Sequence, residues 1–432
     1  MGNFLSRKFS ALPYIYNDNK DDIMEQSPNR QKRIMRSLFD VEEEKVGQES
    51  EEDLSSLQNL SQAVLWSTDW TTETIINQLQ KGNIDLLPSF QRRDAWGADR
   101  KSSFIESVML GLPIPQIILA EHKDRRGSFI VIDGKQRLLS IRQFSTTRID
   151  DEFSPLPLKS LKILKELNGK TYQDISADFE YSNYITTFEN QSIRTVIIRN
   201  WPDQNFLYTV FLRLNTGSLP LSPQELRQAL NPGPFTTFAD DFSVNSIEIK
   251  SALGIDKPDY RMRDVEIVIR YFAFKNFIED YRGNLKEFLD NTCSQLNVFW
   301  EEGELIIREQ AEELNKAISV TFQIFGENAF SKYSNENYTG IFNRPVFDIM
   351  VYYFSMPEIR QECLDKGQEI AATFESLCKN DIGFLRSLEN STKNIEPTIK
   401  RYSEWGFALK RILNKEFEVP QKSEEGNGII LR

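Results

Sequence analysis

The spacing of apolar residues changes near residue 232, and this change constrains the fold more than any other feature of the chain. Before it, short apolar runs at 117–120 and 129–132 and an alternating segment at 192–199 are separated by amphipathic stretches, a pattern that predicts strands between helices. After it, from about 260 to 415, apolar residues recur every three or four positions with few Pro or Gly, which predicts helices. The sequence therefore predicts an α+β region followed by an all-α region.

Local signals place the helices within each region. In the first, we expect helices over 71–80, 99–110, 138–144 and 203–214, with an extended stretch over 84–90. Ser222, Pro223 and Glu225 form the pattern of a capping box with proline at the first helical position, so a further helix starts there. In the second region, the expected helices cover 264–277, 285–299, 305–325, 346–354, 359–378 and 399–417.

The same patterns divide the chain into four parts. Residues 1–60 are polar, with eight acidic side chains between 40 and 53, and are predicted to be a disordered acidic arm. The folded part is expected to begin near Ala63 to Trp66, and the Asn-Pro-Gly-Pro run at 231–234 is a domain boundary. The predicted parts are thus 1–60, a mixed domain at 61–235, a helical domain at 236–418 and a flexible tail at 419–432.

Charge is distributed unevenly along the chain. The net charge of −12 argues against a protein that coats nucleic acid with a broad basic surface. Residues 91–148, however, contain eleven Lys or Arg and six Asp or Glu, a local balance of 11 − 6 = +5. A local site for an anion is therefore compatible with the acidic composition.

The cysteines and the lack of long apolar runs bear on location. Cys293, Cys363 and Cys378 are far apart and have neither the spacing of a zinc site nor that of a disulfide framework. We expect buried thiols in a reducing compartment, the cytoplasm. No uninterrupted apolar run approaches the roughly 18 residues of a membrane span, so no membrane association is expected.

The sharpest chemical motif follows the second predicted strand and reads Ile-Asp-Gly-Lys-Gln-Arg-Leu over 132–138. Gly134 lets the backbone turn and approach a ligand closely. The free N–H groups of the next helix favour an anion, and Lys135 and Arg137 add positive charge. Asp133 is a candidate ligand for a divalent cation. Together these residues suit a phosphate group with its metal; the alternative is an ordinary Asp-Gly turn with solvated cations.

Four segments resemble, in the same order, the N-terminal domain of GmrSD-type restriction enzymes. They read PSFQRRDAW, ESVMLGLPIPQIILAE, FIVIDGKQRLLSIRQF and FLRLNTGSLPLSPQELRQAL, and the resemblance covers about residues 63–232. Behind them, YRMRDVEIVIRYFAF resembles the start of the helical segment that family members often carry. The resemblance implies a ParB/sulfiredoxin-like fold, a small mixed sheet with helices, and a role in nucleotide-dependent restriction or anti-phage defence.

The resemblance also assigns roles by position. It implies catalytic roles for Asp133, Gln136 and Arg137, with Asp133 on the metal. Nucleotide or phosphate contacts would come from Gln91, Arg92, Gly134 and Lys135, although Lys135 stands where many members have Gln. Further candidates are Trp96, beside the first motif, and Asn215 and Glu225 in a weaker third motif, for which a turn residue and a capping-box acid are the alternatives. The implied cofactors are a nucleoside triphosphate and Mg²⁺, and DNA is the implied partner.

A single histidine, His122, limits the chemistry further. Enzymes of this type often end in a His-Asn-His nuclease domain, which one histidine cannot supply. If DNA is cut, a partner nuclease or another defence-system subunit is expected to cut it. Three hypotheses stay open: a nucleotide-hydrolysing or nucleotide-sensing subunit, a non-enzymatic DNA-binding scaffold, and a metal-dependent nuclease that uses Asp133.

Overall fold

The computed structural model describes residues 64–84, 86, 93–146, 153–203, 206–207, 210, 222–389, 395–424 and 428–432, which all belong to one compact unit. Several predictions lie outside these residues. They include the acidic arm at 1–60, most of the extended stretch at 84–90, and most of the helix at 203–214.

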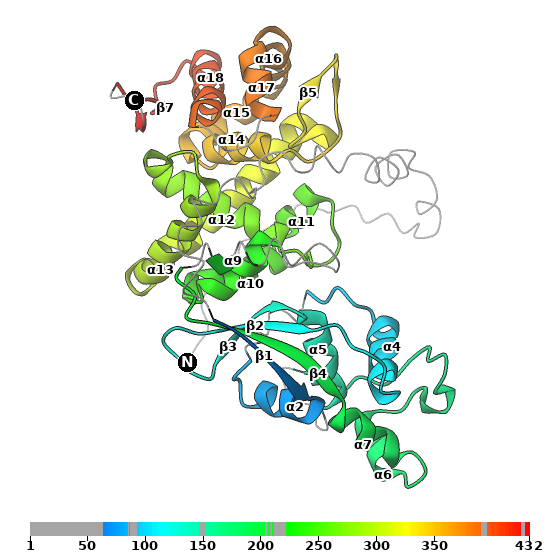
Figure 1. The fold of residues 1–432 in the computed structure, drawn as a ribbon. Coiled ribbons are helices and arrows are strands. Elements are labelled where there is room, and N and C mark those ends of the chain that lie inside the picture. Colours follow the sequence, from blue (N-terminus) through cyan, green and yellow to red (C-terminus); the bar gives the residue numbers. More distant parts are fainter. Residues whose placement is uncertain are drawn as a thin grey trace, which may run out of the picture. The chain divides into compact units, whose positions relative to one another are not determined.

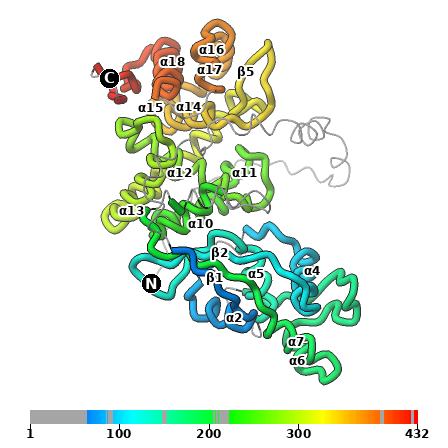
Figure 2. Tube along the Cα trace, viewed as in Figure 1, coloured from blue at the N-terminus to red at the C-terminus, as the bar shows by residue number. Residues whose placement is uncertain are grey.

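The first region is built on a mixed four-stranded sheet in the order β1-β4-β2-β3. The strands are β1 (Val64–Thr71), β2 (Ile117–Glu121), β3 (Phe129–Asp133) and β4 (Ser192–Arg199). β4 is antiparallel to β1 and parallel to β2, while β2 and β3 form an antiparallel hairpin. Figure 2 shows β1 and β4 side by side, although they are far apart in the sequence. The predicted strands at 117–120, 129–132 and 192–199 are confirmed.

Both faces of this sheet are covered around β2 and β3, whereas β1 at its edge is largely exposed. Ile193 and Ile197 of β4 are fully buried in a core shared with helices α2 (Thr72–Gln80), α4 (Ala98–Met109) and α5 (Lys135–Phe144). Shorter elements follow α5: η4 (Lys165–Leu167), α6 (Tyr172–Ala177) and α7 (Ser182–Asn190). On the other face, Ile118, Ile130 and Ile198 pack with Leu226 of α9 (Pro223–Leu230). The sheet therefore has two apolar faces, as its nearly continuous apolar strands require.

The second region is helical apart from two small hairpins. Its helices are α10 (Pro234–Asn245), α11 (Ile247–Leu253), α12 (Arg263–Phe277), η5 (Ile278–Asp280), α13 (Leu285–Phe325), η6 (Gly326–Asn328), α14 (Arg344–Phe354), α15 (Pro357–Asp365), α16 (Gly367–Asn380), α17 (Ile382–Glu389) and α18 (Ile395–Leu413). The hairpins pair β5 (Tyr333–Ser334) with β6 (Asn337–Tyr338), and β7 (Pro420–Lys422) with β8 (Ile429–Leu431). The last hairpin lies in the segment predicted to be a flexible tail, and Ile429 in it is buried.

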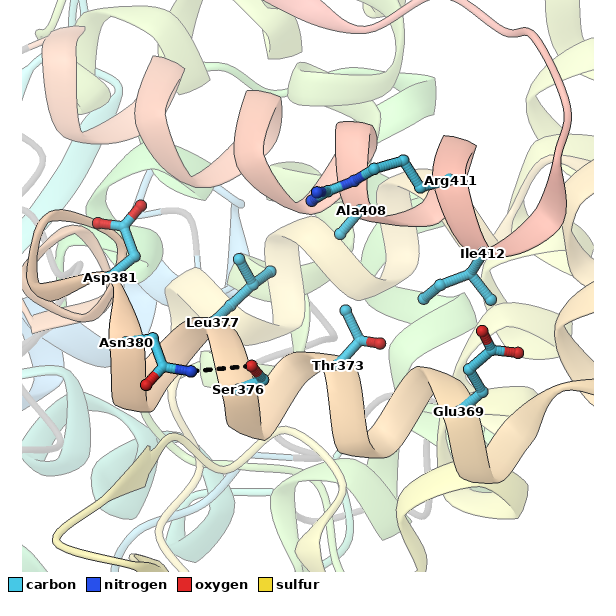
Figure 3. Close-up of a pocket in the computed structure, with 9 residues that line it drawn as sticks. All are labelled: Glu369, Thr373, Ser376, Leu377, Asn380, Asp381, Ala408, Arg411 and Ile412. Atoms are coloured by element: carbon cyan, nitrogen blue, oxygen red, sulfur yellow. Dashed lines mark hydrogen bonds between the residues drawn. The ribbon is translucent and has the colours of Figure 1, made fainter.

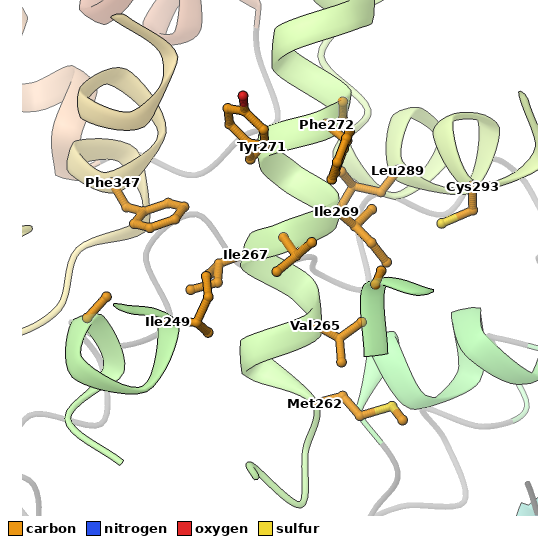
Figure 4. Packing of buried hydrophobic residues seen from close by; sticks show 14 of the residues in the cluster. Ile249, Met262, Val265, Ile267, Ile269, Tyr271, Phe272, Leu289, Cys293 and Phe347 are labelled. Carbon is orange, nitrogen blue, oxygen red and sulfur yellow. The ribbon is translucent and has the colours of Figure 1, made fainter. Parts of the chain in front are cut away.

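Helix α12 lies at the centre of the helical core. Figure 4 shows Phe272 and Ile269 on the side of α12 toward Leu289, and Ile267 on the side toward Phe347 of α14. All five side chains are fully buried. A helix that is apolar on nearly every side must be surrounded by other helices, which is the position that α12 takes.

Two helix boundaries were predicted wrongly. The helices expected at 285–299 and 305–325 are one continuous helix of 41 residues, α13. Gly303 lies inside this helix, and the Phe299 ring lies against it in the space that a Cβ would take. Conversely, the helix expected at 359–378 is two helices, α15 and α16, which meet at Lys366.

The cysteines follow the prediction. Cys293, Cys363 and Cys378 are buried free thiols. Burial raises the pKa of Cys363 and of Cys378 to about 12, so both stay protonated and unreactive near neutral pH. Within the part of the chain that the structure describes, no helix combines the length and the apolar character needed to cross a membrane.

Candidate functional site

The turn between β3 and α5 carries the central motif. Asp133 is the last residue of β3, and Lys135 is the first of α5. Gly134 lies between them with a φ of 97°, a left-handed conformation that side chains disfavour. A Cβ at this position would come within 3.1 Å of Ile117 Cγ1 and 3.3 Å of Arg137 Nη2. Glycine is therefore required both for the turn and for the close approach of Arg137.

Replacing Gly134 with alanine should destabilise the protein by more than backbone strain alone. Strain at a left-handed non-glycine residue costs about 1–3 kcal/mol, and the new methyl group also pushes on Ile117 and Arg137. Gly127→Ala is the matched control, because Gly127 has a φ of 80° but open space around its Cβ position. Urea unfolding of both variants measures the difference. If both variants lost the same free energy of unfolding, the contacts of the new methyl group with Ile117 and Arg137 would not contribute to the loss.

Arg137 is held in a fixed position by two acceptors. Its Nη2 donates to Asp133 Oδ2 at 2.9 Å and to the Gln116 carbonyl oxygen at 2.8 Å. Among the described residues, the buried atoms Arg137 Nε and Gln136 Oε1 have no hydrogen-bond partner. Because unsatisfied buried polar groups are costly, they are suited to receive a polar ligand. The Asp133 side chain is 21% exposed and so remains accessible from solvent.

The Lys135 side chain contacts helix α9. Its Nζ lies 2.5 Å from Glu225 Oε1, and both side chains are 5% exposed. Glu225 Oε2 accepts from the Ser222 N–H at 2.7 Å, and Ser222 Oγ accepts from the Glu225 N–H at 3.1 Å. The predicted capping box is therefore confirmed. Glu225, the acid of this box, also forms an ion pair with Lys135, a role that the sequence did not reveal. The binding of phosphate by Lys135 remains a prediction.

The first motif is described only from Arg93 onward. Gln91 and Arg92 lie outside the described residues, as does Asn215 of the third motif. Sequence reasoning missed Arg93, which is fully buried and bonds groups contributed by the helical region. The only signal that could have marked it is the doubled arginine after Gln91, and a second arginine is more often solvated.

Arg93 makes four hydrogen bonds. Its Nε donates to Asp240 Oδ1 at 2.8 Å and its Nη1 to Asp264 Oδ1 at 2.6 Å. Further bonds reach the Asp259 carbonyl oxygen at 2.7 Å and Ser243 Oγ at 3.0 Å. Burial alone would lower the pKa of Arg93, but the carboxylates of Asp264 and Asp240 outweigh it and raise the pKa. The guanidinium therefore joins the first motif to α10 and to the start of α12.

Trp96 and Lys101 form the neighbouring part of the site. The Trp96 ring packs edge-on against Phe104 with centroids 5.9 Å apart, and the Arg100 guanidinium lies 4.7 Å above it. Lys101 Nζ donates to Gln143 Oε1 of α5 at 2.6 Å and also pairs with Asp94. Burial lowers the pKa of Lys101 to about 8. Trp96 thus has a packing role, and base stacking by its ring stays a prediction.

No set of metal ligands gathers at these motifs in the part of the chain that is described. No group of three or more His, Cys, Asp or Glu is placed to hold a metal there. A hollow of about 460 Å³ lies elsewhere, between α16 and α18, and Figure 3 shows Arg411 reaching over it from α18. None of its lining residues belongs to the motifs: Glu369, Thr373, Ser376, Leu377, Asn380, Asp381, Ala408, Arg411 and Ile412.

Comparison with known proteins identifies the first region. No curated protein and no solved structure matches the chain. A family model described as the GmrSD restriction endonuclease, N-terminal domain, matches residues 72–231, nearly the range over which the resemblance was recognised. The match contains the strands β2 to β4, the Asp-Gly turn and the capping box of α9. Residues 72–231 therefore match the N-terminal domain of the GmrSD restriction endonuclease family.

Proposed function

We propose that this protein is a nucleotide-hydrolysing or nucleotide-sensing, DNA-processing subunit of a restriction or anti-phage defence system. The family match supports the role in restriction and DNA processing. The observation that carries the nucleotide proposal is the fixed guanidinium of Arg137, whose buried Nε has no hydrogen-bond partner among the described residues. The strand, Asp-Gly turn and helix on a small mixed sheet also support a ParB/sulfiredoxin-like fold.

The turn suits the phosphate groups of a nucleotide. The first N–H groups of α5 are free of helical partners and attract an anion. Arg137 would bind phosphate oxygens and stabilise the charge that develops as water displaces the terminal phosphate. Asp133 would contribute one carboxylate to a Mg²⁺ ion held mainly by the phosphates, the usual arrangement for this cation. Lys135 would contribute only if its pair with Glu225 opened.

The test is phosphate release from ATP, GTP, CTP and UTP with Mg²⁺, with and without DNA. Asp133→Ala and Arg137→Ala are expected to lower turnover by about 10²–10³-fold, the loss seen when a charge-stabilising group is removed. Arg142→Ala is the control, since Arg142 lies at the other end of α5 and bonds Thr146 Oγ1. Absence of turnover with every nucleotide, from folded wild-type protein, would overturn hydrolysis.

The second candidate is a non-enzymatic scaffold that binds DNA and a separate nuclease. It is favoured by the closed Lys135–Glu225 pair, which withdraws one cation from the turn. Salt-dependent DNA binding without nucleotide turnover would support it. Under both candidate functions we propose a cytoplasmic location, because a reducing compartment is in keeping with the three free thiols.

A further inference from the structure

One end of the sheet carries a concentration of exposed cations on an otherwise acidic protein. The connection between β2 and β3, which we call the basic hairpin, covers residues 122–128. Its tip exposes Lys123, Arg125 and Arg126, with Asp124 as the one acid among them. The whole chain has a net charge of −12, so the positive charge of this loop is opposite in sign to that of the protein as a whole.

An exposed tryptophan adjoins the basic hairpin through a continuous series of contacts. Trp66 of β1 is 45% exposed, and the Arg199 guanidinium lies 4.3 Å from its ring centroid. Arg199 Nε lies 3.1 Å from Glu121 Oε2 at the end of β2. The Glu121 carbonyl oxygen accepts from Trp201 Nε1 at 2.7 Å, and Lys123 Nζ lies 4.3 Å from the Trp201 ring centroid. Glu121 Oε1 also accepts from the Gly127 N–H of the hairpin at 3.0 Å, so the Glu121 side chain joins Arg199, beside Trp66, to the hairpin.

The sheet itself fixes this surface relative to the nucleotide turn. β3 begins at Phe129, directly after the hairpin, and ends at Asp133. At about 3.3 Å per residue, the two ends of β3 are about 13 Å apart. A molecule on the basic hairpin would thus occupy a position separate from the turn while remaining on the same rigid strand.

We propose that the basic hairpin, with Trp66 and Arg199, is a nucleic-acid-binding surface of this domain. The cations contact backbone phosphates, which accounts for a basic loop on an acidic protein. The exposed indole offers a face on which an unpaired base stacks, and stacking tolerates any sequence. This inference rests on the proposed function, because it names the surface for the DNA that such a subunit processes.

The test compares two triple variants that remove the same charge from different parts of the domain. Lys123→Ala/Arg125→Ala/Arg126→Ala changes the basic hairpin, and Lys159→Ala/Lys162→Ala/Lys165→Ala removes three exposed cations from the segment that leads into and begins η4. The probe is a labelled 20-nucleotide DNA of mixed sequence, single-stranded or as a duplex, titrated at several salt concentrations. The hairpin triple should reduce the salt slope of binding by about 2–3, and the control triple should leave it unchanged.

Trp66 provides an independent test. Trp66→Ala should weaken single-stranded binding by about 5- to 100-fold and affect the duplex much less, because only an unpaired base offers its face. Phe179→Ala is its control, since Phe179 is 98% exposed on the same domain. Nucleotide turnover without DNA should be the same in all these variants as in the wild type. Absence of turnover from the wild type itself would mark a failure of the proposed enzyme and not of this surface. Equal DNA binding by the two triples, or by Trp66→Ala and wild type, would overturn the inference.

Discussion

Replacing Arg93 with alanine is expected to lower the free energy of unfolding by about 3–5 kcal/mol. Removing one partner of a buried ion pair leaves the other charge without compensation, and the loss has this size. Here the carboxylates of Asp240 and Asp264, 2% and 0% exposed, would both lose their cation. The Asp259 carbonyl oxygen and Ser243 Oγ would also lose a donor. The expected measurement is a shift of the urea midpoint in a two-state unfolding curve.

The control for Arg93 is an arginine whose ion pair is exposed. Arg194 Nε lies 3.2 Å from Asp69 Oδ1, and both side chains are more than half exposed. Arg194→Ala should therefore cost less than about 1 kcal/mol. Arg93→Lys is expected to resemble alanine more than wild type, because one ammonium cannot replace a planar fork that bonds two carboxylates. Similar small losses for Arg93→Ala and Arg194→Ala would contradict the structural role given to Arg93.

Replacing either member of the Lys135–Glu225 pair alone is expected to cost more than replacing both. Glu225→Gln would remove the carboxylate that pairs with the buried Lys135 ammonium, and Lys135→Gln would remove the cation that pairs with Glu225. Each single change should cost about 3–5 kcal/mol. The double variant removes both charges, and Gln at 225 still accepts the capping hydrogen bond from Ser222, so its loss should be well below the sum.

A double-mutant cycle measures this coupling directly. The reference cycle uses Lys379 and Glu336, an ion pair whose side chains are 60% and 76% exposed. The coupling energy of this exposed pair should be below about 1 kcal/mol. The coupling energy of the buried Lys135–Glu225 pair should be clearly larger. Additive losses at Lys135 and Glu225 would show that the pair contributes no coupling. If the double variant also turns over nucleotide, Lys135 is a structural residue and not a phosphate ligand.

The sequence determined those features that depend on residues close together in the chain. The alternation in 192–199 identified β4, and the spacing of Ser222 and Glu225 identified the capping box and the start of α9. The order of four linear motifs identified the family, which residues 72–231 match. The turn at Asp133 and Gly134 was also readable, because a strand, a glycine and a helix follow one another directly. Such signals act over a few residues and need no knowledge of packing.

Only the tertiary structure decided what distant residues do to each other. β1 showed no clear alternation, and it is a strand because its backbone pairs with β4 along its whole length. Arg93 is buried because α10 and α12 bring Asp240 and Asp264 to it, and Lys135 is neutralised by an acid 90 residues later in the chain. A charged side chain looks the same in a sequence whether it is solvated or buried. Its environment is set by segments that meet only after folding, so the role of each of these charges is fixed by packing and not by its neighbours in the chain.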